Sequence, residues 1–236
     1  MPSQATPPSA RAPSAATDPA VRAALAWLHT ARFLTTASEL HQLPVTERPE
    51  IAFVGRSNAG KSTAINTLAQ QRQLAFASKT PGRTQHINLF ALGPREAADA
   101  VLADLPGYGY AAVERSAKLR WQAVMADYLA QRRNLAGVVL LVDPRHGLTE
   151  LDHQLLQFVS PRVANGSVRL LVVLTKADKL NRQQATLALQ AAQQALARYV
   201  TEEADIGLVL FSGLRRTGLG DVATALHGWV HGQASA

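Results

Sequence analysis

The residues of this chain best suited to chemistry form a short loop framed by two glycines, which follows the apolar run at residues 51–54. Gly55 and Gly60 permit backbone dihedral angles at which consecutive N–H groups curl around an oxyanion. Lys61 brings a positive charge to the β- and γ-phosphates of a nucleotide, and the Ser62 hydroxyl can ligate a Mg²⁺ ion that bridges them. A chance glycine turn is the alternative interpretation. The spacing favours a phosphate-binding loop (P-loop), whose residues are Gly55, Arg56, Ser57, Asn58, Ala59, Gly60, Lys61 and Ser62.

A second candidate group ends and follows the apolar run at residues 100–105. Asp104 can hold Mg²⁺ through a water molecule, and the backbone N–H of Gly107 can contact a γ-phosphate. Such a group would sense whether the γ-phosphate is present. We therefore assign to the nucleotide site Asp104, Leu105, Pro106 and Gly107.

A third group of residues predicts which base the bound nucleotide carries. Thr175, Lys176, Ala177 and Asp178 follow the apolar run at residues 168–174. The carboxylate of Asp178 can accept hydrogen bonds from N1–H and the N2 amino group of guanine, whereas adenine has an acceptor at N1 and no amino group at C2. The pattern therefore predicts GTP and GDP as ligands. A small-residue loop whose backbone can reach the guanine O6 contains Phe211, Ser212 and Gly213.

A sheet must position these groups, because each follows a run typical of a buried strand. Near-continuous apolar runs predict strands covered on both faces, and they lie at residues 51–54, 87–92, 100–105, 137–143, 168–174 and 206–211. Capping residues Thr149 and Asn181 mark the starts of two helices. Segments typical of helices lie at residues 62–68, 114–133, 150–160, 182–199 and 219–230. The alternation predicts an α/β three-layer fold, with a six-stranded, mostly parallel sheet and a ligand at the carboxyl ends of the strands.

The composition limits the class of protein further. The 236 residues carry 24 Lys and Arg against 17 Asp and Glu, a formal charge of +7. This excess suits a protein that works beside a polyanion, although it could serve solubility alone. The lack of Cys excludes disulfides and thiolate metal sites. No apolar run approaches the roughly 18 residues that a membrane span needs, so we expect a soluble, cytoplasmic protein.

The order of these groups resembles that of the translation-factor-related small GTPases. Two long motifs sharpen the resemblance, Ser-Lys-Thr-Pro-Gly-Arg-Thr-Gln-His-Ile-Asn at residues 78–88 and Asp-Leu-Pro-Gly-Tyr-Gly-Tyr at residues 104–110. Together with Phe-Val-Gly-Arg-Ser-Asn at residues 53–58, they are similar to the EngB family (also called YihA or YsxC) of bacterial ribosome-assembly GTPases, over roughly residues 25–232. The resemblance implies a Ras-like P-loop fold, binding of GTP and Mg²⁺, a role in maturation of the large ribosomal subunit, and the family's traditional association with cell division and septation.

The resemblance also implies roles for individual residues. Thr84 would close on Mg²⁺ when the γ-phosphate is present, so the metal ligands would be Ser62 and Thr84. The catalytic group would consist of Lys61, Thr84, Gly107 and Asn58. Around Thr84, the residues that would join the nucleotide site are Gly82, Arg83, Gln85 and His86.

The predicted domain organisation is a single domain with two tails. Residues 1–19 are rich in Ala, Pro, Ser and Thr and are predicted to be disordered, because such a composition cannot bury a core. A transit peptide is the alternative, although interspersed prolines disfavour its amphipathic helix. The folded domain covers residues 20–232, with a helical extension over residues 20–48 and a Ras-like core over residues 49–232. Residues 233–236 form a C-terminal tail.

Two positions depart from the general GTPase pattern. Thr175 stands where Asn is usual, which predicts a weaker tie between the guanine-binding loop and the P-loop. Tyr108 stands where many GTPases carry a water-orienting Gln, so intrinsic hydrolysis is predicted to be slow or to depend on a partner or a cation. Asn58 resembles the asparagine that ligates K⁺ in related GTPases, where the ion offsets transition-state charge. The alternative is a turn residue that only hydrogen-bonds the loop.

Basic residues that follow the second group are candidate contacts for ribosomal RNA. They are Arg115, Lys118, Arg120, Arg132 and Arg133, with Arg215 and Arg216 as a further patch. A solvated helix face is the alternative interpretation. The predicted partners are GTP or GDP and a precursor of the large ribosomal subunit, with a monomer as the expected state. Two rival functions stay open: a P-loop kinase, which would leave Asp178 unexplained, and a nucleotide-gated RNA-binding module without useful hydrolysis, which Tyr108 favours.

Overall fold

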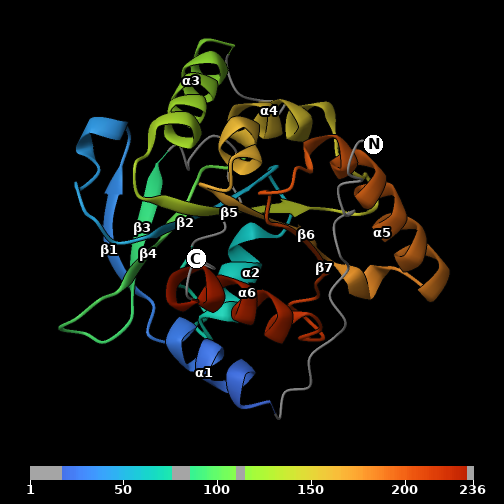
Figure 1. The fold of residues 1–236 in the computed structure, drawn as a ribbon, viewed down its shortest axis with the longest axis horizontal. Coiled ribbons are helices and arrows are strands. Elements are labelled where there is room, and N and C mark those ends of the chain that lie inside the picture. The colour runs from blue at the N-terminus through green and yellow to red at the C-terminus, as the bar shows by residue number, and fades with distance from the viewer. Residues whose placement is uncertain (1–17, 76–85, 110–114, 233–236) are drawn as a thin grey trace.

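A sheet crosses the molecule with helices on both of its faces, as Figure 1 shows. The computed structural model describes residues 18–75, 86–109 and 115–232, and for residues 115–122 the backbone alone. The arrangement confirms the predicted α/β three-layer class with a mostly parallel sheet.

The strands of the described residues form one sheet. They are β1 (Arg32–Ala37), β2 (Glu50–Gly55), β3 (Ile87–Leu92), β4 (Ala100–Asp104), β5 (Leu135–Val142), β6 (Arg169–Leu174) and β7 (Ile206–Leu210). Their order across the sheet is β1, β3, β4, β2, β5, β6, β7. The strands from β4 to β7 in this order are parallel, while β3 is antiparallel to both β4 and β1. The carboxyl ends of β2, β4, β5, β6 and β7 therefore meet at one edge.

The seven strands correct the expected number of six. The added strand is β1, which lies at the edge of the sheet and exposes Phe33 and Leu34. An edge strand has no need of the continuous apolar run that marks a doubly covered strand, so this pattern did not reveal it. β1 also changes the helical extension expected over residues 20–48, because the first helix spans Pro19–Leu28 and is followed by β1 and a 3₁₀ turn at Leu40–Gln42.

The helices divide into two layers. They are α1 (Pro19–Leu28), α2 (Lys61–Leu68), α3 (Arg115–Gln131), α4 (Glu150–Ala164), α5 (Arg182–Leu196) and α6 (Leu219–His231), with the 3₁₀ turns η2 (Ala177–Lys179) and η3 (Ala197–Tyr199). Helices α1, α2 and α6 cover one face of the sheet, and α3, α4 and α5 cover the other (Figure 1). None of the described helices is long and apolar enough to cross a membrane.

The central strand β2 is buried on both faces. Ile51 and Phe53 pack into the core under α1, α2 and α6, whereas Ala52 and Val54 pack into the core under α3, α4 and α5. All of them are 0% exposed, because successive side chains of a strand point to opposite faces. This double coverage fixes the carboxyl end of β2, from which the P-loop starts.

Two helices that start at the same edge carry the predicted caps. Asp152 accepts a 2.7 Å hydrogen bond from the backbone N–H of Thr149, and Gln184 accepts a 2.9 Å bond from that of Asn181. Both capping boxes are complete, and each satisfies N–H groups that a helix start leaves unpaired. The caps hold the starts of α4 and α5 beside the ends of β5 and β6.

Candidate nucleotide-binding site

The predicted phosphate-binding loop connects β2 with α2, which begins at Lys61. Gly60 precedes the helix with a φ of 96°, a left-handed conformation that glycine adopts readily because it lacks Cβ. Asn58 has a φ of 65°, and Asn tolerates this region better than most residues. These two positions curve the loop tightly, and it ends at the N-terminus of α2, which favours an anion.

The ammonium group of Lys61 forms an ion pair with the carboxylate of Asp104, at the end of β4. The two side chains are 12% and 3% exposed, so little water screens the pair. Because β2 and β4 are parallel neighbours, the first and second groups of the sequence prediction come together at one edge of the sheet.

The segment after Asp104 runs beside the P-loop. The backbone N–H of Tyr108 donates to the Gly55 carbonyl over 3.3 Å, and that of Ser57 donates to the Tyr108 carbonyl over 2.7 Å. Gly107 approaches the loop so closely that a Cβ there would lie 3.1 Å from the Cα of Ser57. A side chain at position 107 would therefore push this segment away from the P-loop.

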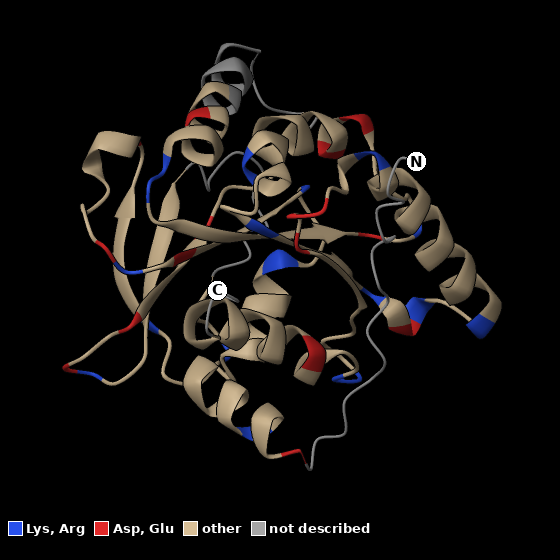
Figure 2. Cartoon of the chain, viewed as in Figure 1, with Lys and Arg blue, Asp and Glu red and all other residues tan. Residues whose placement is uncertain are grey.

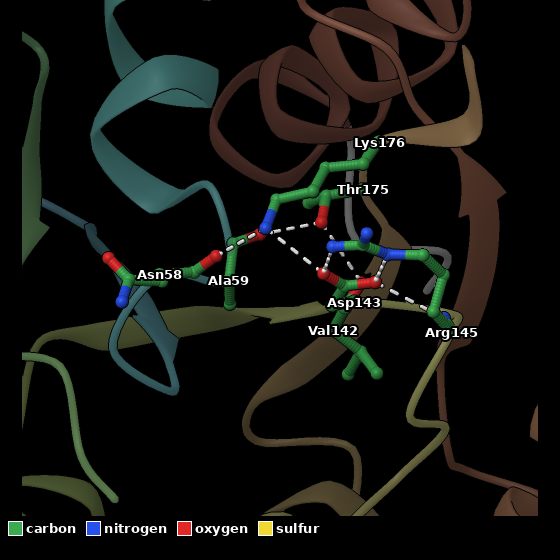
Figure 3. Close-up of polar contacts among 7 residues, drawn as sticks. All are labelled: Asn58, Ala59, Val142, Asp143, Arg145, Thr175 and Lys176. Atoms are coloured by element: carbon green, nitrogen blue, oxygen red, sulfur yellow. Dashed lines mark hydrogen bonds and ion pairs between the residues drawn. The ribbon is translucent and has the colours of Figure 1, made fainter. Parts of the chain in front are cut away.

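The predicted guanine-binding loop, residues 175–178, is tied to the P-loop by two side chains, as Figure 3 shows. The Thr175 hydroxyl donates a 2.6 Å hydrogen bond to the Ala59 carbonyl, and the Lys176 ammonium donates a 2.6 Å bond to the Asn58 carbonyl. Thr175 is 2% exposed, so water does not compete for this bond. The tie that we expected Thr175 to weaken is made directly by its hydroxyl.

The carboxylate of Asp178 lies at η2 and is held by the loop after β7. Ser212 donates a 2.6 Å hydrogen bond from its hydroxyl to Asp178 Oδ1, and it accepts a 3.1 Å bond from the backbone N–H of Arg215. The bond from Ser212 lowers the pKa of Asp178. Asp178 is therefore ionised and acts as an acceptor alone, the form that can receive the N–H groups of guanine.

The side chain of Tyr108 is held by α4. Its hydroxyl donates a 2.5 Å hydrogen bond to Asp152 Oδ1, while Asp152 Oδ2 accepts 2.7 Å bonds from the N–H and the hydroxyl of Thr149. Burial raises the pKa of Tyr108 well above its ordinary value, and Asp152 adds to the effect. The phenol therefore stays protonated and acts as an anchor between the segment after β4 and α4.

The sequence reasoning missed Asp143 and Arg145, which follow β5 at the same edge. Asp143 accepts hydrogen bonds from the Arg145 guanidinium over 2.9 and 2.6 Å and from the Lys176 ammonium over 3.0 Å. The Arg145 guanidinium holds the pKa of Asp143 well below its usual range, and Lys176 acts in the same direction. A signal was available, because Asp143 ends the strand predicted at residues 137–143, and Asp104 lies next to the end of the one predicted at residues 100–105.

Five residues predicted for the nucleotide site have no described contact with it. The switch residues Gly82, Arg83, Thr84 and Gln85 lie outside the described residues. His86 is described, and its Nδ1 lies 2.8 Å from Ser38 Oγ, beside β1.

Other predicted residues contribute backbone rather than side chains. Ala59, Leu105, Pro106 and Phe211 are buried. The Ala177 N–H donates a 3.0 Å hydrogen bond to the Phe211 carbonyl, which joins η2 to the loop after β7. A Cβ on Gly213 would lie 2.9 Å from Thr63 Cγ2, so this loop also packs against α2.

One candidate RNA contact is corrected by the structure. Arg132 donates hydrogen bonds over 3.0 Å to each carboxylate oxygen of Glu50, and its side chain is 13% exposed. It is engaged inside the protein and is not available to a phosphate. Arg133, Arg215 and Arg216 are exposed, and the side chains of Arg115, Lys118 and Arg120 lie outside the description.

Of the residues predicted to hold Mg²⁺ directly or through water, Ser62 and Asp104 lie in the part of the chain that the structure describes. Ser62 is the second residue of α2, directly after Lys61, and Lys61 reaches the Asp104 carboxylate. A hydroxyl and a carboxylate at one edge are oxygen donors of the kind that a hard cation prefers, so the donor set fits Mg²⁺. Thr84, the other predicted ligand, lies outside the described residues.

The fold and these loops define a small P-loop GTPase of the Ras-like class. A family model described as "50S ribosome-binding GTPase" matches residues 50–176. The chain is 62% identical over 209 residues to "Probable GTP-binding protein EngB" of Albidiferax ferrireducens, covering 88% of this chain and 97% of that protein. It is 58% identical over 229 residues to the protein of the same name from Polaromonas sp., covering 97% of this chain and 89% of that protein. The chain belongs to the EngB family of GTPases.

Solved structures agree with this fold. A crystal structure of a probable GTP-binding protein EngB superposes with a TM-score of 0.56 at 19% identity, covering 77% of this chain and 98% of that one. The structure of Era in complex with MgGDPNP and nucleotides 1506–1542 of 16S ribosomal RNA gives a TM-score of 0.58 at 18% identity, covering 81% of this chain and 60% of that one. At these identities the similarity supports the Ras-like fold alone.

Proposed function

We propose that this protein is a magnesium-dependent GTP switch with slow intrinsic hydrolysis, which acts in the cytoplasm in assembly of the large ribosomal subunit. Its membership of the EngB family and its match to a family described as ribosome-binding support this proposal. The observation that carries it is the pair of hydrogen bonds, from Thr175 to Ala59 and from Lys176 to Asn58. They join the loop that reads the base to the loop that binds the phosphates, so one GTP molecule can engage both.

Lys61 and Asp178 act at opposite ends of the nucleotide in this proposal. Lys61 binds oxygens of the β- and γ-phosphates and thereby leaves Asp104, while Asp178 accepts hydrogen bonds from guanine. The Gly107 N–H contacts the γ-phosphate, which couples the segment after β4 to its presence. When bound at Ser62, Mg²⁺ supplies positive charge that offsets the phosphates. Water attacks the γ-phosphorus in line, and catalysis comes from positioning and electrostatics.

The contact of Tyr108 with α4 supports slow hydrolysis. Because its hydroxyl is bonded to Asp152, this side chain does not hold the attacking water. Turnover would then depend on K⁺ bound at Asn58, on a ribosomal partner, or on both. The same observation favours a second candidate, a nucleotide-gated RNA-binding module without useful hydrolysis. The family match gives no support to the kinase alternative.

A polyanionic partner is supported by the formal charge of +7. Figure 2 shows Lys and Arg spread over both helical layers, which suits distributed contacts with phosphates. Arg215 and Arg216 are exposed beside the guanine-binding loop, so we include them among the RNA contacts. We expect the protein to act as a monomer. A role in cell division and septation, implied by the family resemblance, belongs to the same proposal and would follow from impaired ribosome assembly.

Co-sedimentation with ribosomal subunits tests the proposal. The protein is mixed with subunits and a non-hydrolysable GTP analogue, GDP or no nucleotide. We expect association with large subunits in the analogue state and about tenfold weaker association with GDP, a coupling typical of a switch.

Matched variants separate the switch from unspecific binding. Lys61→Ala and Asp178→Asn should lose the response to nucleotide, and Asp205→Asn, whose side chain is 62% exposed, should keep it. Because Lys61 also neutralises the buried Asp104, circular dichroism must show that Lys61→Ala is folded. Association that is indifferent to the nucleotide and to both variants would contradict the switch.

A further inference from the structure

We propose that Asp143 is a positioning residue for guanine-nucleotide binding, which holds the Lys176 ammonium group on the P-loop carbonyl of Asn58. The inference rests on the proposed function, since it assumes that a guanine nucleotide binds between these loops. It extends the site to a carboxylate that the P-loop and guanine-binding motifs do not include.

The first observation is that the carboxylate of Asp143 is held in a single orientation. Oδ1 accepts from the Arg145 N–H over 3.2 Å and from Arg145 Nε over 2.9 Å, and Oδ2 accepts from Arg145 Nη2 over 2.6 Å and from Lys176 Nζ over 3.0 Å. An ionised carboxylate has about four acceptor positions, and these bonds occupy all of them. Arg145 therefore aims the remaining position of Oδ2 at Lys176.

The second observation is that the Lys176 ammonium group donates hydrogen bonds to two acceptors. It donates to Asn58 O over 2.6 Å and to Asp143 Oδ2 over 3.0 Å (Figure 3). Lys176 follows the end of β6 with a backbone φ of 52°, and its side chain reaches the P-loop at the Asn58 carbonyl.

The third observation is that packing alone does not immobilise this lysine. The Lys176 side chain is 32% exposed, and it borders a pocket of about 270 Å³ lined also by Asn58, Asp143 and Arg145. Ordering a long lysine side chain costs rotamer entropy. By holding the ammonium before the nucleotide arrives, Asp143 removes part of this cost from binding.

A positioning role for Asp143 and a simple effect of its charge predict opposite changes in nucleotide affinity when Asp143 is neutralised. A nucleotide phosphate group is an anion, so neutralising a nearby carboxylate should strengthen binding if only long-range charge mattered. If Asp143 positions Lys176, Asp143→Asn should weaken binding, because an amide cannot satisfy both Arg145 and Lys176.

The test is the affinity and dissociation rate of a fluorescent GDP, measured with the full chain. We expect Asp143→Asn to weaken GDP binding about tenfold, mainly through faster dissociation.

Lys176→Met, which keeps the apolar stem and removes the ammonium group, should weaken GDP binding at least as much. In a protein that already carries Lys176→Met, Asp143→Asn should weaken GDP binding by less than about a further twofold, because both substitutions remove the same interaction between Asp143 and Lys176. Asp205→Asn is the matched control, because it neutralises a carboxylate that pairs with Arg169 and is 62% exposed, and it should change affinity less than about twofold.

Thermal unfolding without nucleotide shows whether each variant is folded, and Asp143→Ser replaces Asp143→Asn if the latter is not. Parent-like or tighter GDP binding by folded Asp143 variants would overturn the inference, as would a full tenfold effect in the Lys176→Met background. If the parent protein itself fails to bind GDP, the proposed function fails. If the parent binds and the Asp143 variants bind equally well, the positioning role alone fails.

Discussion

The hydroxyl of Tyr108 donates a 2.5 Å hydrogen bond to Asp152 and so links the segment after β4 to the start of α4. Tyr108 is 5% exposed, and its backbone also pairs with the P-loop at Arg56. One residue therefore contacts both the P-loop and α4. If this segment moves toward a γ-phosphate, either the hydrogen bond from Tyr108 to Asp152 breaks or the start of α4 moves with the segment.

We predict that Tyr108→Phe lowers the free energy of unfolding by about 1.5–3 kcal/mol, the usual effect of removing one partner of a buried hydrogen bond to a charged group. The change is measured by urea unfolding of the nucleotide-free protein. The GTP hydrolysis rate at saturating GTP should stay within about twofold of the parent, because the hydroxyl contacts α4 rather than the attacking water.

Tyr199→Phe is the matched control, because Tyr199 is half-buried at η3. It should change the free energy of unfolding by less than about 0.5 kcal/mol. If Tyr108→Phe slows hydrolysis tenfold or more while the protein stays folded, the hydroxyl takes part in catalysis, and the role argued for Tyr108 is wrong.

The sequence predicted the central strands and the loops that follow them, because burial and phosphate chemistry both leave local patterns. Ile51 and Phe53 lie in a run that has to be apolar on both faces, and Gly60 and Lys61 stand at a spacing that the phosphate loop demands. The sequence could not predict which side chains pair across strands. Lys61 meets Asp104 because β2 lies beside β4, and strand order is not readable from either segment alone.

Three features escaped prediction for related reasons. β1 carries exposed Phe33 and Leu34 at the edge of the sheet, so its apolar residues do not form a buried run. Asp143 was included in a predicted strand, but its partner Lys176 is far away in sequence. Arg132 was assigned to a surface because it is basic and near a helix end, whereas the buried acid that engages it, Glu50, lies on β2. Each depends on a contact between distant segments.

We predict that K⁺ stimulates GTP hydrolysis about 100-fold over Na⁺, the lower end of the rate effect of one well-placed electrostatic contact in a transition state. The Asn58 amide makes no hydrogen bond to any other described residue, so it is available to a cation. Asn58→Gly should abolish the stimulation, and Gly keeps the φ of 65° without strain. Single-turnover hydrolysis in KCl and NaCl, with and without ribosomes, measures the effect.

Asn165→Ala, at the C-terminal end of α4, is the control for this prediction and should keep the response to K⁺. Equal rates in both salts under all conditions would show that Asn58 is a turn residue alone.

We predict that the ion pairs of Asp143 stabilise the fold at neutral pH and lose this effect in acid. Their hydrogen bonds lower the pKa of Asp143 in the folded state, so the stabilisation is present above the unfolded pKa of about 3.9 and disappears as the pH falls toward the folded value. The difference in unfolding free energy between the parent and Asp143→Asn should be constant from about pH 5 to 8 and shrink below about pH 4. Urea unfolding across this range measures it. A difference that grows in acid would contradict the assignment.

We predict that Glu50→Ala lowers the free energy of unfolding by about 3–5 kcal/mol, because it leaves the Arg132 charge buried without its partner. Glu50 is 0% exposed, and it accepts hydrogen bonds from Arg132 and from the hydroxyl of Tyr128. Glu202→Ala, on an exposed turn, is the control and should cost less than about 0.5 kcal/mol.

The double variant Glu50→Ala/Arg132→Met should recover part of this loss, since it removes the charge that the single variant leaves unpaired. A double variant at least as unstable as the sum of both single variants would mean that the lost packing, rather than the unpaired charge, causes the effect. GDP affinity should stay within about twofold of the parent in every folded variant of this series. The reason is topological: Glu50 begins β2 and the P-loop leaves the opposite end of the same strand, so the buried charge cluster and the nucleotide site lie at opposite edges of the sheet.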